Sequence, residues 1–302
     1  MADTPLELAF STVAQRVIPG ATLLAHRPLK GGVSAAVHVL DISSPAGLAR
    51  LVVRRHGAAK WKALASDVTQ TEFQLLATLH RAGLPVPRPR LLDDSALLLP
   101  SPFFVMDMVD GSTDIAAASL DSALHQMARF LARLHAIDVD VLRLPPLPSR
   151  EDPVQGALEY LPCGPELAPL REVVASYGVR RARPSLLHGD FWPGNVLWAK
   201  AELAAVIDWE DAALGPPVSD VAGCRAELNA LFDAAASRSF TDHYLAASGA
   251  ELCDLPLWDV YVGSAALATL PVWGLPAEEE ARRRERTTAF VSHAAEVLLL
   301  TQ

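Results

Sequence analysis

Three oxygen-bearing side chains, Asp190, Asn195 and Asp208, flank short apolar runs in one stretch of the sequence. Asn195 directly precedes the run 196–198, and Asp208 ends the run 203–207. Apolar runs separated by polar, Gly- or Pro-containing segments are typical of short strands joined by turns. If these two strands pair as an antiparallel hairpin, the start of one lies beside the end of the other. We therefore expect Asn195 and Asp208 to meet at one end of a small sheet, with Asp190 nearby.

These residue types suit a magnesium-dependent reaction. Mg²⁺ prefers oxygen ligands and usually takes one or two carboxylates together with phosphate and water, so Asn195 and Asp208 are candidate metal ligands. Asp190 remains to accept a proton from a substrate hydroxyl or to orient that hydroxyl toward a phosphoryl group. The bland alternative is a strand, turn and strand with a buried Asp and no chemistry, but it must also explain Asp220. The set as a whole favours phosphoryl transfer.

The spacing matches a known pattern. H-G-D-x-x-x-x-N at 188–195 and I-D-W-E at 207–210 resemble the two motifs of the aminoglycoside phosphotransferase-like family of small-molecule kinases. Protein kinases keep the same separation between Asp and Asn, but this chain has Gly189 where they have Arg. The resemblance implies an α+β, two-lobed protein-kinase-like fold, with a small β-rich N-terminal lobe and a larger, mostly helical C-terminal lobe. It further implies ATP and Mg²⁺ as cofactors, Asp190 as catalytic base, and His188 in the catalytic loop, which it braces by hydrogen bonding.

The resemblance also assigns residues to the nucleotide. Gly31, Gly32 and Ser34 would form a loop that covers the ATP phosphates with backbone N–H groups, although a Gly pair by itself is usually a hairpin turn. Arg54 stands on the strand where protein kinases carry a Lys, and Glu72 on the next helix would pair with it. The alternatives are that Arg54 simply belongs to an edge strand and that Glu72 is favoured by the positive end of its helix.

The strand 102–109 is the expected hinge between lobes, where backbone near Met106 and Met108 would bind the adenine edge. We place the lobe boundary there, which gives a nucleotide-binding lobe over 1–108 and a catalytic and substrate-binding lobe over 109–302. Helical patterns are expected within 3–18, 68–82, 120–136, 167–176, 221–247 and 256–300.

Other features beyond the hinge have structural interpretations. The Pro-rich segment 138–165 is expected to be loop-like. His135 is interpreted as structural, and Asp220 as a residue that caps a helix and braces the catalytic loop. Glu210 could contact metal or substrate, or be solvated. Four aromatic residues of the C-terminal helices could line a pocket, but most are expected in the core: Trp258, Tyr261, Trp273 and Phe290.

Composition limits the class of protein. Of 302 residues, 51% are hydrophobic and 20% charged, which is typical of a packed globular chain. The net charge of −9 argues against nucleic acid as a partner. The three cysteines are few and widely spaced, which indicates reduced thiols. We see no signal peptide and no apolar run long enough to span a bilayer, so we expect a cytoplasmic protein that does not contact the membrane. The sequence does not indicate an oligomeric state.

The resulting hypothesis is an ATP-dependent phosphotransferase that moves the γ-phosphoryl group to a hydroxyl of a small molecule. The acceptor could resemble an aminoglycoside, a macrolide, a sugar or an amino alcohol. ATP and GTP are both possible, because base choice depends on hinge backbone geometry. The alternatives are a nucleotide-binding pseudoenzyme and a nucleotidyl transferase on the same fold.

Overall fold

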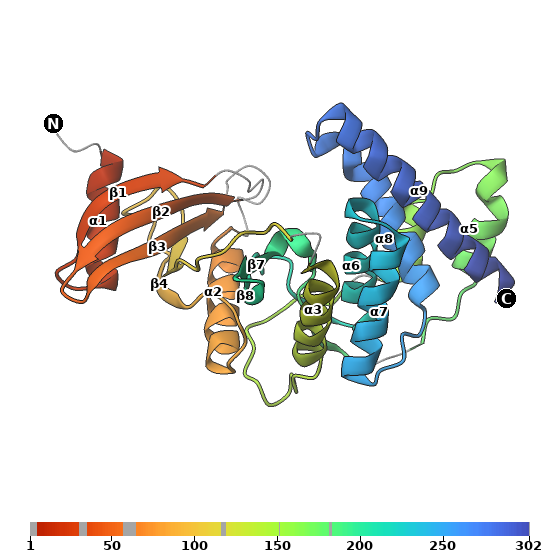
Figure 1. Ribbon diagram of the computed structural model, residues 1–302, viewed down its shortest axis with the longest axis horizontal. Coiled ribbons are helices and arrows are strands. Elements are labelled where there is room, and N and C mark those ends of the chain that lie inside the picture. The colour runs from red at the N-terminus through yellow and green to blue at the C-terminus, as the bar shows by residue number, and fades with distance from the viewer. Residues whose placement is uncertain are drawn as a thin grey trace. The chain divides into compact units, whose positions relative to one another are not determined.

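The computed structural model describes residues 5–29, 35–56, 65–115, 119–150, 152–180 and 183–301. The chain forms two compact units (Figure 1). The first contains Met1–Gly111 together with two short later segments, Arg143–Pro146 and Ala204–Glu210. The second contains Ser112–Leu142, Leu147–Leu203 and Asp211–Gln302. The first long segment therefore ends close to the expected lobe boundary, but Asp208 belongs to the same unit as Arg54.

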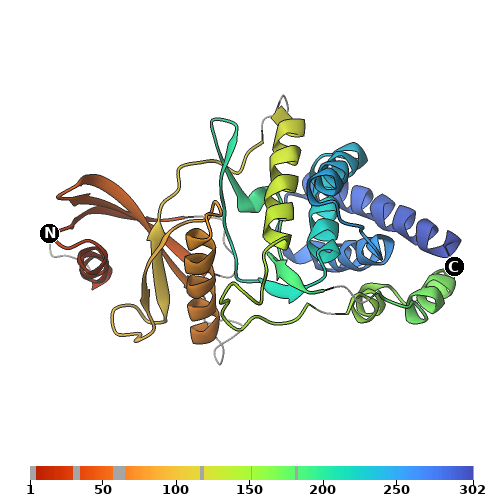
Figure 2. The same ribbon diagram turned by 90° about the horizontal axis from the view of Figure 1, so that it is seen from below.

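An antiparallel sheet of five strands forms the centre of the first unit, in the order β1-β2-β3-β5-β4. Helices α1 and α2 contact this sheet (Figure 2). The turn between β2 and β3 contains Gly47 at φ 113°, a backbone conformation that glycine adopts without steric cost. The bounds are α1 Pro5–Val17, β1 Thr22–Pro28, β2 Ala35–Ser44, β3 Gly47–His56, α2 Ala65–Arg81, β4 Pro89–Asp93 and β5 Phe103–Asp107.

The alternation of side chains along β3 decides which residues meet which helix. Successive side chains of a strand point to opposite faces of the sheet. Val53 packs in the hydrophobic core that includes Phe10 of α1, so Arg54 lies on the other face. On that face Phe104 of β5 contacts Phe73 of α2, with ring centroids 6.2 Å apart. The period of two therefore brings the Arg54 guanidinium toward α2.

Helices dominate the second unit, which also contains the short strands β6, β7 and β9; the last three residues of β8 belong to the first unit. Strand β6 pairs antiparallel with β9, and β7 pairs with β8. The β7–β8 turn has Lys200 at φ 52° and Ala201 at φ 65°, which are the positive angles of a tight two-residue hairpin. The bounds are α3 Leu120–His135, α4 Pro153–Tyr160, α5 Ala168–Ala175, β6 Ser185–Leu187, β7 Val196–Ala199, β8 Glu202–Val206, β9 Ala213–Gly215, α6 Val218–Leu231, α7 Ala234–Ser248, α8 Leu255–Thr269 and α9 Ala277–Leu300; the single-turn helices are η2 Pro165–Leu167, η3 Pro193–Asn195 and η4 Leu270–Val272.

Two local signals account for helix ends that the pattern analysis placed differently. The segment 138–165 was expected to be loop-like, and this is wrong over α4. Asp152 caps α4 by accepting a hydrogen bond from Val154 N at 2.8 Å, and Pro153 occupies the first turn. The expected helical run 221–247 is divided by Asp233, whose side chain caps α7. A short polar cap thus interrupts a long Ala- and Leu-rich stretch.

The expectation that no apolar run could span a bilayer is wrong as stated. Among the described helices, the stretch Leu255–Val272 is long and apolar enough by length and composition. In this structure 44% of that stretch is buried, and α8 packs against α4, α6 and α9. Packing within the second unit therefore accounts for part of its hydropathy.

Candidate active site

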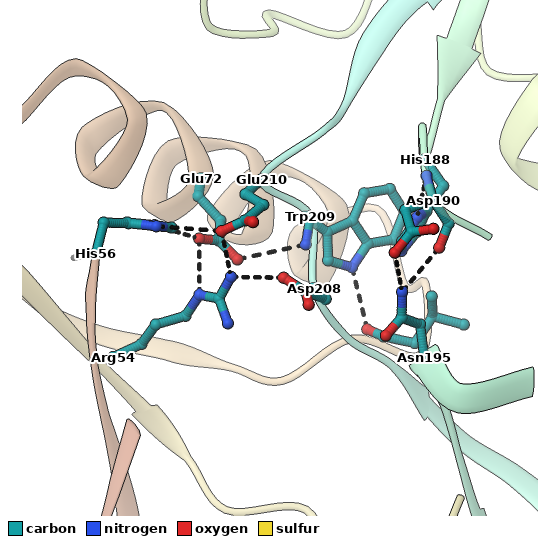
Figure 3. Close-up of polar contacts among 10 residues, drawn as sticks. Arg54, His56, Glu72, His188, Asp190, Asn195, Asp208, Trp209 and Glu210 are labelled. Atoms are coloured by element: carbon teal, nitrogen blue, oxygen red, sulfur yellow. Dashed lines mark hydrogen bonds and ion pairs between the residues drawn. The ribbon is translucent and has the colours of Figure 1, made fainter. Parts of the chain in front are cut away.

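The first unit contains a partly buried group of charged side chains, the charge cluster, made of Arg54, His56, Glu72, Asp208 and Glu210 (Figure 3). Arg54 Nε donates to Glu72 Oε2 at 3.1 Å. Arg54 Nη2 donates to Asp208 Oδ1 at 2.5 Å and to Glu210 Oε2 at 2.8 Å. His56 lies 2.8 Å from Glu72 through Nε2 and 3.2 Å from Glu210 through Nδ1. One guanidinium and one imidazole thus contact three carboxyl groups.

Mutual charge determines the protonation of this cluster. Burial favours neutral forms, but the charge of Glu72, followed by those of Asp208 and Glu210, outweighs it and raises the pKa of Arg54. Burial likewise opposes the charged form of His56, yet hydrogen bonds to Glu210 and Glu72 raise its pKa to about 9. Against burial, Arg54 and His56 lower the pKa of Glu72. At neutral pH Arg54 and His56 are therefore both positively charged beside an ionised Glu72.

Asp208 and the residues after it are fixed inside the first unit. Asp208 has φ 67°, which is uncommon for a residue with a side chain. Trp209 N donates to Glu72 Oε1 at 3.3 Å, and the indole Nε1 donates to Val206 O at 3.0 Å. Trp209 is 1% exposed. Packing of this side chain holds the two flanking carboxylates toward Arg54.

The loop 188–195 of the second unit follows β6 and is braced by Asp220. Asp220 Oδ2 accepts from His188 N at 2.7 Å, and Oδ1 accepts from Gly189 N at 2.9 Å. His135 Nε2 lies 3.3 Å from Asp220 Oδ2, and its Nδ1 lies 2.8 Å from the Tyr244 hydroxyl. The predicted bracing role of Asp220 and structural role of His135 are therefore confirmed. The predicted helix cap is wrong, because Asp220 lies within the first turn of α6 and makes no side-chain cap bond.

Gly189 is required by both conformation and space. Its φ is 87°, and a Cβ at this position would lie 1.9 Å from the Asp211 carbonyl oxygen. No side chain fits there without movement of the backbone. The position that is Arg in protein kinases is thus glycine here because of a close backbone approach.

Asn195 holds Asp190 in place (Figure 3). Its Nδ2 donates to the Asp190 backbone oxygen at 2.8 Å and to Asp190 Oδ2 at 2.9 Å. Asp190 N donates to His188 Nδ1 at 3.2 Å. Asn195 is 6% exposed, whereas Asp190 is exposed. Because the amide nitrogen of Asn195 is used by Asp190, its amide oxygen faces away and can accept a cation.

A pocket of about 220 Å³ lies beside this loop, wholly within the second unit. Its apolar walls come from Phe191, Trp192, Tyr261, Val262 and Trp273. Its polar groups come from Arg150, Asp190, Ser219, Asp220 and Glu227. The aromatic side chains therefore divide: Trp258 and Tyr261 are buried in a hydrophobic core cluster as expected, and Tyr261 and Trp273 line the pocket.

Glu227 forms a second charged wall of this pocket. Arg283 Nη1 lies 3.1 Å from Glu227 Oε2, and Arg283 Nε lies 3.2 Å from Glu279. The Arg283 guanidinium also lies 5.9 Å from the ring centroid of Trp273. Burial raises the pKa of Glu227, Arg283 lowers it, and the charge of Asp190 adds to the increase. The carboxylate of Glu227 is thus neutralised by a neighbour in the same unit.

The remaining predicted site residues are only partly placed. Gly31, Gly32 and Ser34 lie outside the described residues. Met106 lies within β5, and Met108 directly follows it; Met108 N donates to Arg50 O at 3.1 Å. The Met108 N–H is therefore engaged within the first unit, and base binding by the backbone near Met106 and Met108 stays a prediction.

Several residues of these two sites were missed or left open by sequence reasoning. Glu210 belongs to the charge cluster and is not a solvated side chain, because it contacts Arg54 and His56. His56 was missed, although its place two residues after Arg54 puts both on one face of β3. Arg150 and Ser219 gave no sequence signal, since nothing local indicates that they share a pocket.

The donor set fits magnesium better than a structural metal. Within the described ranges there is no group of three or more His, Cys, Asp or Glu side chains that could hold a metal ion. Mg²⁺ does not need one, because it is commonly bound through one or two protein oxygens plus phosphate and water. The Asn195 amide oxygen and the Asp208 carboxylate are oxygens of that kind. Asn195 belongs to the second unit and Asp208 to the first, so their sharing of one ion stays a prediction.

Comparisons with known proteins identify the class of protein to which this chain belongs. The sequence model of the phosphotransferase enzyme family matches residues 25–261. The chain belongs to this family.

Solved structures support the protein-kinase-like fold. A putative aminoglycoside phosphotransferase from Ralstonia eutropha superposes with a TM-score of 0.70 at 15% identity, covering 96% of this chain and 97% of that one. A macrolide 2′-phosphotransferase from Brachybacterium faecium gives 0.64 at 21% identity, covering 94% and 97%. An aminoglycoside 2′-phosphotransferase-IIIa in complex with GDP gives 0.65 at 19% identity, covering 95% and 99%. The expected two-lobed α+β fold is confirmed.

The curated relatives are much longer proteins. Acyl-CoA dehydrogenase family member 10 of Mus musculus is 28% identical over 171 residues, which are 51% of this chain and 16% of the relative. Family member 11 of Rattus norvegicus is 26% identical over 170 residues, 50% of this chain and 22% of the relative. The chain thus spans about a fifth of the length of these relatives.

Proposed function

We propose that the protein transfers the γ-phosphoryl group of ATP to a hydroxyl group of a small molecule. The observation that carries this proposal is the geometry at Asp190, an exposed carboxylate at a pocket wall. Its Oδ2 is held by Asn195 at 2.9 Å. A fixed carboxylate beside a pocket is what an acceptor hydroxyl needs in order to be oriented and deprotonated.

In the proposed reaction Asp190 binds the acceptor hydroxyl through Oδ1 and takes its proton as the oxygen attacks the phosphoryl group. Asn195 restrains Asp190. His188 contributes by accepting the Asp190 N–H, which fixes the loop. Asp220 holds the N–H groups of His188 and Gly189 in place. Each step therefore depends on side chains that position the reacting groups and neutralise their charge.

Charge neutralisation on the nucleotide is assigned to the first unit. Arg54, oriented by Glu72, would bind phosphate oxygens, which a guanidinium can contact in bidentate fashion. Asn195 and Asp208 would hold Mg²⁺, which supplies charge neutralisation and orientation of the triphosphate when bound. The neighbour structures in complex with GDP support nucleotide use and make GTP a natural competitor to test. We also propose that the protein is located in the cytoplasm.

The test is ADP release from ATP and Mg²⁺ across a panel of small hydroxyl compounds, with Asp190→Asn compared against Asp242→Asn. Asp242 is an exposed carboxylate of α7, so its variant controls for charge. Loss of the base should reduce stimulated turnover by about 10²–10⁴-fold, while the control keeps it. Release of AMP and pyrophosphate instead of ADP would identify nucleotidyl transfer, and equal turnover in Asp190→Asn would refute the assigned base.

A further inference from the structure

The carboxylates of the pocket already have partners. Asp220 accepts two backbone N–H groups, Glu227 is paired with Arg283, and Asp190 is held by Asn195. A cationic ligand would have to displace one of these partners or occupy Asp190 Oδ1, which the proposed reaction assigns to the acceptor hydroxyl. The acidic residues therefore do not by themselves indicate a polycationic acceptor.

Two buried hydrogen-bond donors of residues at the same pocket, in contrast, have no partner within the described part of the chain. Ser219 is 2% exposed, and its Oγ has no hydrogen-bond partner within the described part of the chain. Arg150 Nε is buried and likewise has no partner there. Buried polar groups in folded proteins are nearly always satisfied, and leaving one unpaired costs about 1–3 kcal/mol. Both residues line the pocket, and neither atom has a partner within the described part of the chain, so a ligand in the pocket is a candidate partner for both.

The backbone holds Arg150 in this position. Arg150 N donates to Leu214 O at 2.8 Å, and Leu214 N donates to Pro148 O at 2.8 Å. The Arg150 stem passes directly over Gly215, where a Cβ would lie 2.6 Å from Arg150 Cβ. Glycine at 215 thus makes room for the arginine. Ser219 follows in the first turn of α6, whose helix dipole favours negative charge.

We propose that the acceptor is a small hydroxycarboxylate, whose carboxylate is bound by the Arg150 guanidinium and the Ser219 hydroxyl while its hydroxyl group meets Asp190. This inference rests on the proposed function, since it names the acceptor class for the same pocket. A guanidinium and a hydroxyl together supply the donors that a carboxylate requires. A volume of about 220 Å³ is below the range of about 300–1,000 Å³ of pockets for drug-sized ligands, so the acceptor is small.

The charge balance favours a carboxylate over a phosphate monoester. One cation, Arg150, matches one negative charge, whereas a phosphate monoester carries about −1.5 to −2 at pH 7. The excess charge would face Asp190 and Glu227 at the same pocket. A neutral alcohol, in contrast, would leave Arg150 without a counter-charge.

The experiment uses matched pairs of acceptors on the full chain: 3-hydroxybutyrate, 6-hydroxyhexanoate and gluconate, each beside its primary amide. Binding is measured by calorimetry and phosphoryl transfer by ADP release. We expect at least one acid to bind more tightly than its amide and to be phosphorylated with the higher kcat/KM. Arg150→Gln, which keeps the stem over Gly215, should lower kcat/KM for the acid by about 10- to 100-fold and change the amide less than threefold. Ser219→Ala should give a loss of about 3- to 10-fold.

Arg129→Ala is the matched control, because Arg129 is exposed on α3 and does not line the pocket. Absence of preference for every acid over its amide would overturn the inference, as would an unchanged preference in Arg150→Gln. If a neutral or cationic acceptor is the better substrate, the inference fails while the proposed function stands. If the acids bind in an Arg150-dependent way but no phosphoryl group is transferred, the proposed function fails while the anion site stands.

Discussion

Replacing His56 with Gln should remove a pH-dependent part of the stability of the first unit. His56 is buried between Glu72 and Glu210, and its pKa is raised from the ordinary 6.5 to about 9. A factor of ten in proton affinity corresponds to about 1.4 kcal/mol, so this shift corresponds to about 3 kcal/mol. Because the folded-state pKa lies above the unfolded-state value, the contribution is complete below about pH 6.5 and is lost as the pH rises through about 9.

The assay is urea unfolding of wild type and His56→Gln at several pH values from 6 to 10. The difference in free energy of unfolding between the two proteins should be largest at pH 6 and shrink by about 3 kcal/mol by pH 10. His80→Gln is the matched control, because His80 is exposed near the end of α2. Parallel pH profiles for wild type and His56→Gln would refute the assignment of a charged imidazole to the cluster.

Further variants test single contacts in both units, each by urea unfolding. Asp220→Asn should cost about 2–3 kcal/mol, because an amide replaces a charged acceptor of two buried N–H groups; an unchanged midpoint would contradict its bracing role. Gly189→Ala should cost at least about 3 kcal/mol, since its Cβ would overlap a backbone oxygen. Gly83→Ala also has a positive φ but open space around it, so only about 1–2 kcal/mol is expected. Asp259→Ala should cost about 3–5 kcal/mol by leaving Arg225 unpaired in the helical core; a loss below 1 kcal/mol would refute this.

Local pattern was sufficient for the elements that carry chemistry. Apolar runs between turn residues predicted the strand before Asp190 and the two strands of the β7–β8 hairpin. The contact of Arg54 with Glu72 was expected from the resemblance and is present at 3.1 Å. These features depend on residues close in sequence or on a motif shared by a family.

Contacts between residues far apart in the chain could not be predicted from the sequence. Glu210 was as compatible with solvent as with a site, because Arg54 lies far away along the chain and only folding brings the two together. Arg150 and Ser219 come from separate segments, and their shared pocket has no periodic signature. Helix α4 was missed because it is eight residues long with an internal Gly, and propensity is a weak signal over so short a span. The Asp-Pro pair at its start was the sequence signal that could have predicted this helix.

The segment 204–210 belongs to the first unit although it follows most of the second in sequence. It supplies Val206, whose N–H donates to Pro85 O at 2.8 Å, and Trp209, which donates to Glu72. An N-terminal fragment that ended at residue 111 would therefore lose an indole from its interior and two counter-charges of Arg54. The first unit cannot be excised by a single cut of the chain. A fragment of this unit would need residues 204–210 supplied in trans, as in a split-protein complementation design, before it could keep its buried guanidinium neutralised.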